Sequence, residues 1–459
     1  MRSKSRPRII FENIDRELRR LHADRRGNIA VMMAFLFPII AGGLGLGFEV
    51  SNWYLRTRAM QNAADAAAIG AATNNGSNYD VEAKAVTAQY GFVDGSNNVT
   101  VTASNTATCP AGGNTCYSVT ITSLVPLYLS QVVGYHGDST LNGAPEKTLS
   151  NTAIAQQTTV KQPICMLGLS QTAQALRTNG APNSNFSGCS VMSDSAATCN
   201  GSNLNANWGL AAGNNNGCGN KQKSNIPVVT DPYYAMHTNI PTNTCSSYAQ
   251  ETEQGSSHSG GISWSGNQNL SGTVEKCGDV RRTGNVVINT SNNTTGATLV
   301  IENGQLDLNG FTLSTSSGSA VTIVFSGTSG NYQHIPTDNS TGQGGVLNIQ
   351  APSSSSALFS GMAIYQDPNL TTGVDITYKG NNPDWNISGG VYLPNSNVQI
   401  SGDVSQSANG ADCFVMVANT VLINGTSNIY QQSPDGSGCK PAGLNMPSAT
   451  IPGRTQLVD

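Results

Sequence analysis

The C-terminal two-thirds of the chain carries acidic side chains that could, by type, cleave a polysaccharide. Its notable aspartates are Asp279 (close to Arg281 and Arg282), Asp307, Asp338, Asp367, Asp375, Asp384, Asp403 and Asp412. Glycoside hydrolysis needs two carboxyl groups roughly 5–9.5 Å apart. Most of these aspartates adjoin Gly, Asn or Pro, where the side chain hydrogen-bonds to the backbone of a turn. The sequence therefore favours turn-forming roles, and we expect no catalytic residue and no enzyme.

Other catalytic and cofactor motifs point the same way. The five histidines are scattered without an H-E-x-x-H pattern, and neither G-x-S-x-G nor a phosphate-binding G-x-x-x-x-G-K-[ST] sequence occurs. Residues 403–407 fit the D-x-S-x-S cation motif of von Willebrand A-type domains, in which the motif follows a buried strand and opens a helix. Here Gly402 precedes it and Asn409-Gly410 follow, which indicates a turn. We expect no bound metal and no cofactor.

The first 50 residues have the composition of a membrane anchor. Nine Lys or Arg and four Asp or Glu occupy the first 26 residues, and an uncharged segment of 20 residues, Ile29 to Phe48, follows. About 20 apolar residues cross the hydrocarbon core as a helix, and the basic flank stays in the cytoplasm. A cleavable signal peptide is the alternative, although its apolar core spans only ~7–15 residues. We expect a basic cytoplasmic head (1–28), a retained transmembrane helix (29–50) and an exported, periplasmic body.

Three residues of the span could contact other membrane helices. Gly43 and Gly47 form a G-x-x-x-G pattern that lets a second helix approach closely, although simple helix flexibility explains the same glycines. Glu49 lies at the exported interface, where it either extends to the lipid headgroups or makes a polar contact with another helix. The remaining chain has 14 basic and 23 acidic residues and no basic patch, so we expect no nucleic-acid partner.

The helix is expected to continue into the exported region. Residues 53–72 are rich in Ala, a strong helix former, and an apolar seam follows Trp53, Met60, Ala64, Ala67 and Ala71. This seam could pack on the chain's own next domain or on a partner helix.

The order of these features resembles the N-terminal segment of TadE/TadG-like Flp-pilus assembly proteins. The resemblance lies in Arg25-Arg26-Gly27-Asn28-Ile29-Ala30, the apolar span, Glu49, and residues 60–68, which include Gln61, Ala64 and Asp65. It covers about 50 residues. It implies membership of an envelope machine that builds or anchors thin pili, with other pilus-assembly membrane proteins as partners. Some members carry a processed leader with Glu five residues after a Gly; that position after Gly27 is Met32.

The composition of the expected exported body changes along the chain and predicts four parts. Residues 51–160 read as the continuing helix and a small α/β domain of pilin-like build. Residues 161–285 are irregular and rich in Asn, Gly and Ser. Residues 286–435 alternate short β-branched runs with Asn-Gly corners, which predicts a β-solenoid; a jelly roll or sandwich is the alternative. Residues 436–459 read as a tail.

All ten cysteines follow the anchor, and none has C-x-x-C spacing. In an oxidising compartment they can form disulfides, with free buried thiols as the alternative. Cys109 with Cys116, and Cys413 with Cys439, are the leading pairs.

These observations predict a structural component that anchors or assembles Flp-type pili from the inner membrane. The bilayer is an expected partner, and further copies of the chain are a candidate one. A surface adhesin or glycan-binding protein is the second hypothesis, and a membrane-tethered polysaccharide lyase or hydrolase is the third.

Overall fold

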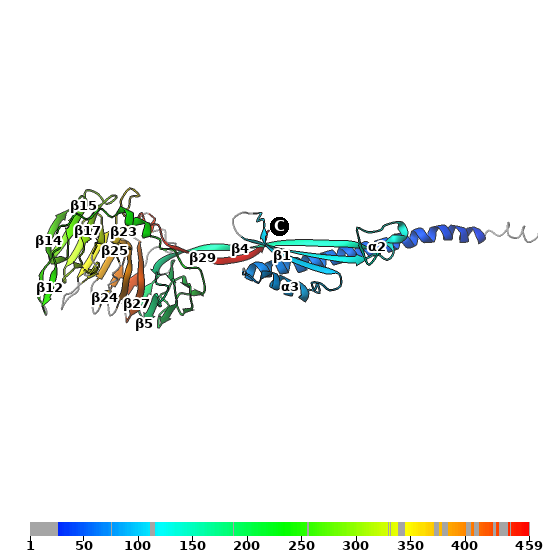
Figure 1. Ribbon diagram of the computed structural model, residues 1–459, viewed down its shortest axis with the longest axis horizontal. Helices are drawn as coiled ribbons and strands as arrows, with labels where there is room; N and C mark the ends of the chain where they lie inside the picture. The colour runs from blue at the N-terminus through cyan, green and yellow to red at the C-terminus, as the bar shows by residue number, and fades with distance from the viewer. Residues whose placement is uncertain are drawn as a thin grey trace, which may run out of the picture. The chain divides into compact units, whose positions relative to one another are not determined.

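A computed structural model describes residues 26–74, 76–110, 115–186, 188–254, 257–328, 330, 332–337, 345–370, 376–378, 384–400, 405–407, 413–425, 428–430, 439–440 and 442–458 (Figure 1). The chain forms two compact units. The first contains the residues up to Thr159 together with Pro452–Asp459, and the second contains Val160–Ile451.

One long helix dominates the first unit. Helix α2 runs without interruption from Arg26 to Asn74 and continues through Pro38. Its 49 residues span about 73 Å at 1.5 Å per residue, more than twice the thickness of a hydrocarbon core. It is long and apolar enough to cross a membrane. The helix therefore does not end at residue 50, where the sequence predicted the end of the transmembrane segment.

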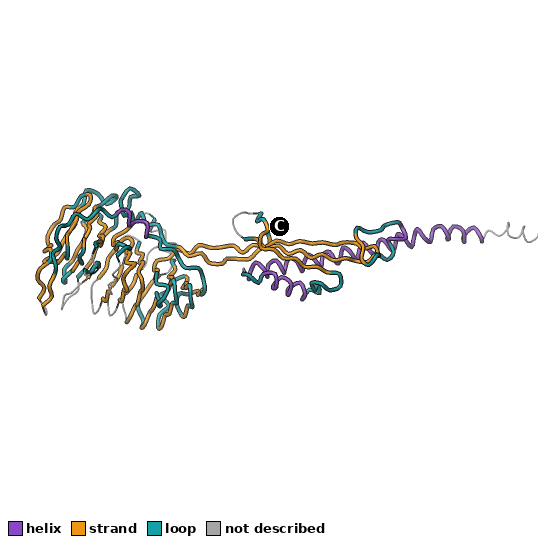
Figure 2. Tube along the Cα trace, in the orientation of Figure 1, coloured by secondary structure: helices purple, strands orange, loops and turns teal. Residues whose placement is uncertain are grey.

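The rest of the first unit is a short helix and an antiparallel sheet. Its elements are α3 (Tyr79–Gln89), β1 (Val99–Ala107), β2 (Cys116–Pro126), the 3-10 helix η1 (Ser130–Val133), β3 (Ser139–Leu141) and β4 (Ala144–Gly168). Strand β2 lies between β1 and β4, and β3 pairs with β4. Helices α2 and α3 lie against one face of this sheet (Figure 2). The buried positions of β2 accordingly alternate with half-buried ones.

The alanine seam of α2 packs on the chain's own sheet. Met60, Ala64, Ala67 and Ala71 are fully buried and share one apolar cluster with Val119 and Ile121 of β2 and Ala153 of β4. Small side chains let the helix axis approach the strands closely. Of the two alternatives for this seam, the structure shows packing on the chain's own domain.

The C-terminal residues differ from the expected tail. Strand β29 (Ser448–Leu457) begins in the second unit and ends in the first. There Thr158 Oγ1 donates a hydrogen bond to the Arg454 carbonyl (2.8 Å), and the Val458 N–H donates to Ile154 (2.9 Å). The chain therefore leaves and re-enters the first unit through two strands, β4 and β29.

The second unit is built mostly from short strands. Before the crossing to β14 it contains β5 (Leu176–Asn179), β6 (Asn183–Asn185), β7 (Ser190–Ser193), β8 (Ala197–Asn200), β9 (Trp208–Ala211), β10 (Asn215–Asn216), β11 (Lys221–Lys223), the 3-10 helix η2 (Tyr234–Asn239), β12 (Glu251–Gln254) and β13 (Ser257–Gly260). These elements occupy the region expected to be irregular, because strands of two to four residues leave little periodicity in a sequence.

The remaining strands begin within the region expected to be irregular, which ends at residue 285, and continue through the region expected to be β-rich, residues 286–435. They are β14 (Ile262–Asn269), β15 (Gly272–Cys277), β16 (Val280–Asn289), β17 (Ala297–Glu302), β18 (Leu306–Asp307), β19 (Thr312–Thr315), β20 (Val321–Ser326), β21 (Pro336–Thr337), β22 (Val346–Gln350), β23 (Met362–Gln366), β24 (Ile376–Tyr378), β25 (Asp384–Ile400), β26 (Ser405–Ser407), β27 (Phe414–Asn424) and β28 (Asn428–Tyr430).

Nearly all described ladders of this unit are parallel. One runs β15–β17–β20–β23–β25–β27, and a second runs β14–β16–β19–β22–β25–β26–β28. Most of these strands therefore pair with a strand two or three positions away in sequence, whereas β25 also pairs with its sequence neighbours β24 and β26. Figure 1 shows the stack from β14 to β27. Strands β12 and β13 form a separate antiparallel pair.

The order of strands in space is not their order in sequence. Strand β27 pairs in parallel with the end of β4 and with β5, at the start of the unit. From there β4, β7, β9 and β11 continue the ladder outward. The chain thus enters the stack in its middle, builds one end, crosses to the other end at β14, and returns to the entry point.

This crossing explains why several strands are apolar on both faces. All residues of β17 and β20 are buried. Their inward side chains join the central core, whereas Val300 and Val324 join an outer cluster that also contains Ile226 and Tyr233 of the crossing segment and Leu444 near the C-terminus. A strand covered on both faces needs a continuous rather than an alternating apolar run.

Candidate membrane interface

Glu49 binds the backbone of a loop that lies about 80 residues further along the chain. Its Oε1 accepts hydrogen bonds from the N–H groups of Tyr128 (2.6 Å) and Leu129 (2.5 Å), and Oε2 accepts one from Ser130 (3.1 Å). These are the unpaired donors at the start of η1, which a carboxylate satisfies well. Glu49 is only 4% exposed, so neither expected role, contact with headgroups or with another helix, describes it in this structure.

The same loop rests on two glycines of α2. A Cβ atom added at Gly42 would lie 2.6 Å from Val133 Cγ1, and one at Gly45 would lie 2.5 Å from Leu129 Cβ. Gly42, Gly45 and Glu49 follow three- and four-residue spacing, so they share one face of the helix. Only glycine leaves room for the loop at these positions.

The glycines singled out by the sequence lie elsewhere on the helix. An added Cβ at Gly43 or Gly47 would meet no atom of the described chain within 4 Å. Their face is free for another membrane helix, and that role stays a prediction. Sequence reasoning missed Gly42 and Gly45, although the Gly-x-x-Gly-x-x-x-Glu spacing was a readable signal.

Further contacts hold the loop and its sheet to the helix just beyond Glu49. The rings of Trp53 and Tyr135 lie 5.9 Å apart. Arg56 donates to the buried Ser123 Oγ from Nε (3.2 Å) and Nη2 (2.8 Å), and its guanidinium lies 5.9 Å from the Phe92 ring. The helix, the loop and β2 therefore form one packed body at the level of residues 42–56.

The polar residues of the seam also bind the sheet. Gln61 Nε2 donates to Asp65 Oδ1 at 2.7 Å, one helical turn away, and Gln61 Oε1 accepts from Asn151 of β4 at 3.0 Å. Ala64 between them is fully buried. Gly27 and Asn28 lie in the first turn of α2, and their side chains are outside the described structure.

A family model described as Flp pilus-assembly TadE/G-like matches residues 27–74. This segment is a TadE/G-like domain. It coincides with α2 from its second residue to its last, so the TadE/G-like helix carries both Glu49 and the alanine seam. The match covers about a tenth of the chain and leaves the second unit without a family. No curated protein and no solved structure matches this chain.

Outside the TadE/G-like segment, three acidic residues gather at one end of the second unit. Asp279 accepts from the backbone N–H groups of Glu251 (2.8 Å) and Gln305 (3.0 Å), and Asp307 pairs in register with Arg281 on the neighbouring strand. Burial first, and the nearby Asp307 carboxylate second, raise the pKa of Glu251. Asp307 and Arg282 are fully buried, so a polysaccharide does not reach them.

Asp307 also has the turn role expected from its sequence. Its Oδ1 accepts from the backbone N–H of Asn309, two residues on, at 2.9 Å, and Asp367 binds Asn369 in the same way. Asp338, Asp375, Asp403 and Asp412 lie outside the described residues, and the last three residues of the D-x-S-x-S motif form strand β26.

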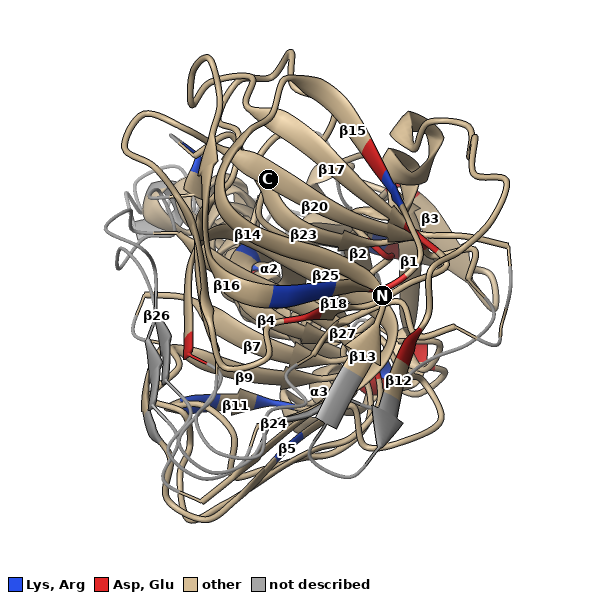
Figure 3. Cartoon of the chain, turned by 90° about the vertical axis from the view of Figure 1, so that its left-hand side faces the viewer, with Lys and Arg blue, Asp and Glu red and all other residues tan. Residues whose placement is uncertain are grey.

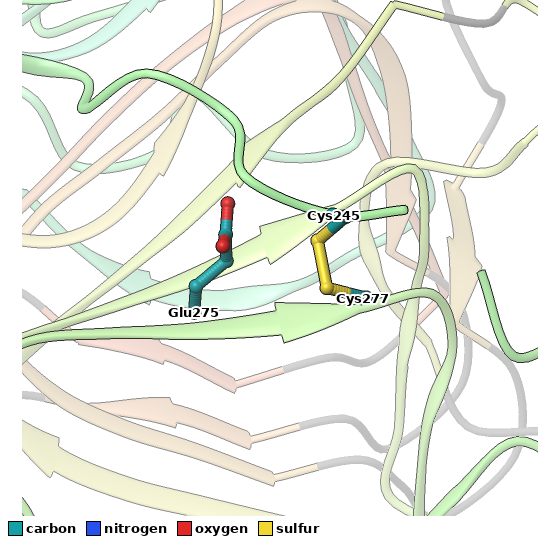
Figure 4. Close-up of side chains that lie close together, drawn as sticks. All are labelled: Cys245, Glu275 and Cys277. Atoms are coloured by element: carbon teal, nitrogen blue, oxygen red, sulfur yellow. A yellow bond between two sulfur atoms is a disulfide. The ribbon is translucent and has the colours of Figure 1, made fainter. Parts of the chain in front are cut away.

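One group of side chains has the composition of a metal site, but its sulfurs are already bonded. Cys245, Glu275 and Cys277 lie close together (Figure 4). Cys245 and Cys277 form a disulfide, and Glu275 accepts hydrogen bonds from the backbone and hydroxyl of Thr244. A disulfide sulfur carries no thiolate charge, so this group lacks the ligands a zinc ion requires.

All ten cysteines are paired in the structure. The bonds include both pairs proposed from the sequence, Cys109–Cys116 and Cys413–Cys439, and further join Cys165–Cys189, Cys199–Cys218 and Cys245–Cys277. The described charged residues of the second unit are few and spread over several strands (Figure 3).

Proposed function

We propose that this protein is a structural component of an Flp-type pilus machine, anchored in the inner membrane with its N-terminus in the cytoplasm. One observation carries the proposal: the TadE/G-like helix spans residues 27–74 and its exported half forms the core of the first unit. In this proposal the helix that crosses the membrane is therefore also part of the folded domain outside it.

In this proposal the first unit is a pilin-like α/β domain and the second a β-solenoid that extends from the cell membrane. The parallel ladders support a solenoid over a jelly roll, whose strands run antiparallel. The five disulfides suit an oxidising periplasm. Partners are other pilus-assembly membrane proteins, reached through the open Gly43 and Gly47 face.

The competing functions have less support. Glycan-binding surfaces use exposed aromatic rings, yet Trp264 and Trp385 are buried and Trp53 and Trp208 are half-buried. The buried Asp307 and Arg282 argue against a lyase or hydrolase. We therefore propose that the protein is not an enzyme.

Pilus counts per cell, by electron microscopy of a deletion strain complemented with variants at equal protein level, test the proposal. Asp307→Asn is expected to restore pili fully, because Asn keeps the turn hydrogen bond. Normal pili in the deletion strain itself would overturn the proposal. A fluorescent protein that matures only in the cytoplasm, fused after Asp459, is expected to stay dark; a bright fusion would reverse the topology.

A further inference from the structure

We propose that residues 127–135, here called the η1 loop, insert into the outer leaflet of the bilayer as a second membrane contact beside α2. The proposal rests on the membrane anchoring proposed above and adds to it a lipid-binding surface in the exported part of the chain.

The η1 loop presents apolar side chains outward. Tyr128 is 72% exposed, Val132 68%, Val133 49% and Leu129 45%. No charged residue occurs from Gly95 to Gly137. A protein that faced only water here would gain nothing from four outward apolar residues within six positions, whereas a lipid-facing loop gains from each of them.

The loop lies level with the apolar span. Leu129 contacts α2 at Gly45, and Val133 contacts it at Gly42, four and seven residues before Glu49. At 1.5 Å per residue the loop descends about 6–10 Å below Glu49, the depth at which interfacial segments lie. The neighbouring helix residues Leu44 and Phe48 are each 71% exposed. The two apolar surfaces are therefore continuous.

Backbone N–H groups of the η1 loop have hydrogen-bond acceptors within the protein, as a medium without water requires. Lipid excludes irregular segments whose N–H groups lack acceptors. Glu49 takes the N–H groups of residues 128–130. Within the loop, Val132 donates to Leu129, Gly134 to Gln131 and Tyr135 to Ser130, each at 3.1 Å. The Gln131 side chain donates back to the Leu127 carbonyl at 2.7 Å.

These features favour lipid, rather than a protein partner, as the contact of the exposed apolar side chains of the η1 loop. A protein partner would need complementary polar contacts at the rim, but the Glu49 carboxylate and the Gln131 amide are already used within the loop. Lipid tails require only an apolar, internally satisfied surface, and they already surround the adjoining stretch of α2 in the proposed topology.

Photocrosslinking in the full-length protein tests this inference. Val132 is replaced by p-benzoylphenylalanine, and the protein is reconstituted into phosphatidylethanolamine–phosphatidylglycerol vesicles that contain an alkyne-tagged phospholipid. Irradiation is expected to attach tagged lipid at position 132. The matched control is Val81, which is 63% exposed in α3. The adjacent residue Glu82 lies beside Gly70, about 30 Å beyond Glu49 along the helix. Position 81 is expected to give at least tenfold less lipid adduct.

The same label at position 37 distinguishes failure of the η1-loop proposal from failure of the proposed membrane anchor. Phe37 is 71% exposed in the apolar span, and the same label there reports whether α2 is in lipid. Adduct at 37 but at background level at 132 would overturn the η1-loop proposal and leave the anchor intact. No adduct at either position would overturn the membrane anchor itself. A protein–protein adduct at 132 in native membranes, without lipid adduct, would show that a partner covers the loop instead.

Discussion

The Leu129 backbone N–H lies 2.5 Å from Glu49 Oε1, although 80 residues separate them in the chain. The last turn of the apolar span is thereby bonded to the η1 loop of the first unit. Because Glu49 receives three backbone donors on its two oxygens, its charge is satisfied without another membrane protein. The contact makes the first unit and its anchor one body, and the following expectations depend on it.

Glu49→Gln is expected to release the η1 loop without unfolding the first unit. The amide loses the negative charge, and its NH₂ group confronts a backbone N–H that formerly donated to the carboxylate. Hydrogen bonds to a charged group contribute about 1.5–3 kcal/mol each, so we expect hydrogen-exchange protection at Tyr128–Ser130 to fall roughly 10- to 150-fold. Glu82→Gln on exposed α3 is the control. Unchanged protection at these three amides would contradict the assignment.

Substitution of neighbouring glycines is expected to have opposite effects. Gly45→Ala places a Cβ 2.5 Å from Leu129 Cβ and should displace the loop, at a cost of about 1–3 kcal/mol in thermal or denaturant stability. Gly43→Ala meets no atom within 4 Å and should be neutral or slightly stabilising, since Ala favours helix over Gly. Comparison of the two purified variants in the same detergent checks this. Equal destabilisation would show that helix flexibility, rather than loop contact, matters.

Replacing both Gly43 and Gly47 by Ile probes the open face of the span. The variant should remain inserted, because the span becomes more apolar, but association with partner membrane helices should weaken, since close approach depends on small residues. Crosslinking of membranes from piliated cells, followed by a pilus count, measures both. Normal pili with this variant would place the assembly contact in another part of the chain.

The cysteines should resist thiol labelling in the denatured but unreduced protein, because all ten are paired. Removing the Cys413–Cys439 bond by a double change to Ser is expected to reduce the free energy of unfolding by about 3 kcal/mol, as for closure of a 26-residue loop. Urea unfolding of the second unit would reveal the loss. Ten reactive thiols in the unreduced protein would refute the pairing.

The second unit should lose stability as pH rises from 4.5 to 7. Glu302 is 1% exposed, and burial first, then Glu275 and Asp367, raise its pKa from 4.5 to about 7. The folded state therefore holds a proton that the unfolded state releases within this window, and stability falls with pH there. Below pH 4.5 and above pH 7 this group adds no slope.

Glu302→Gln should flatten that dependence, because the amide stays neutral at every pH. Melting temperatures of the full chain at pH 5 and pH 8 measure the difference. Asp194, whose pKa burial raises to about 6, and Glu251, whose pKa is raised to about 8, leave a residual slope of the same sign. A variant whose melting temperature changes with pH as much as the parent's would exclude Glu302 as a source.

The sequence alone determined the local features of this protein. The basic head and apolar span predicted the anchor, residues 25–68 carried the TadE/G-like resemblance, and β-branched runs such as residues 321–324 and 415–417 marked strands. These features depend on composition and spacing within one segment. Two cysteine pairs were also readable, because their members are seven and 26 residues apart near expected strands.

Only the tertiary structure decided which surfaces meet. The spacing of Gly42 and Gly45 to Glu49 marks one helix face, but Gly43 and Gly47 are equally small, and only the fold shows which of these faces the η1 loop covers. Glu49 found its donors 80 residues away, and β27 found β4 across some 250 residues. Short strands of similar composition could pair in many registers that the sequence does not distinguish. In the folded chain, the crossing segment buries the second face of several strands, and this burial selects one register.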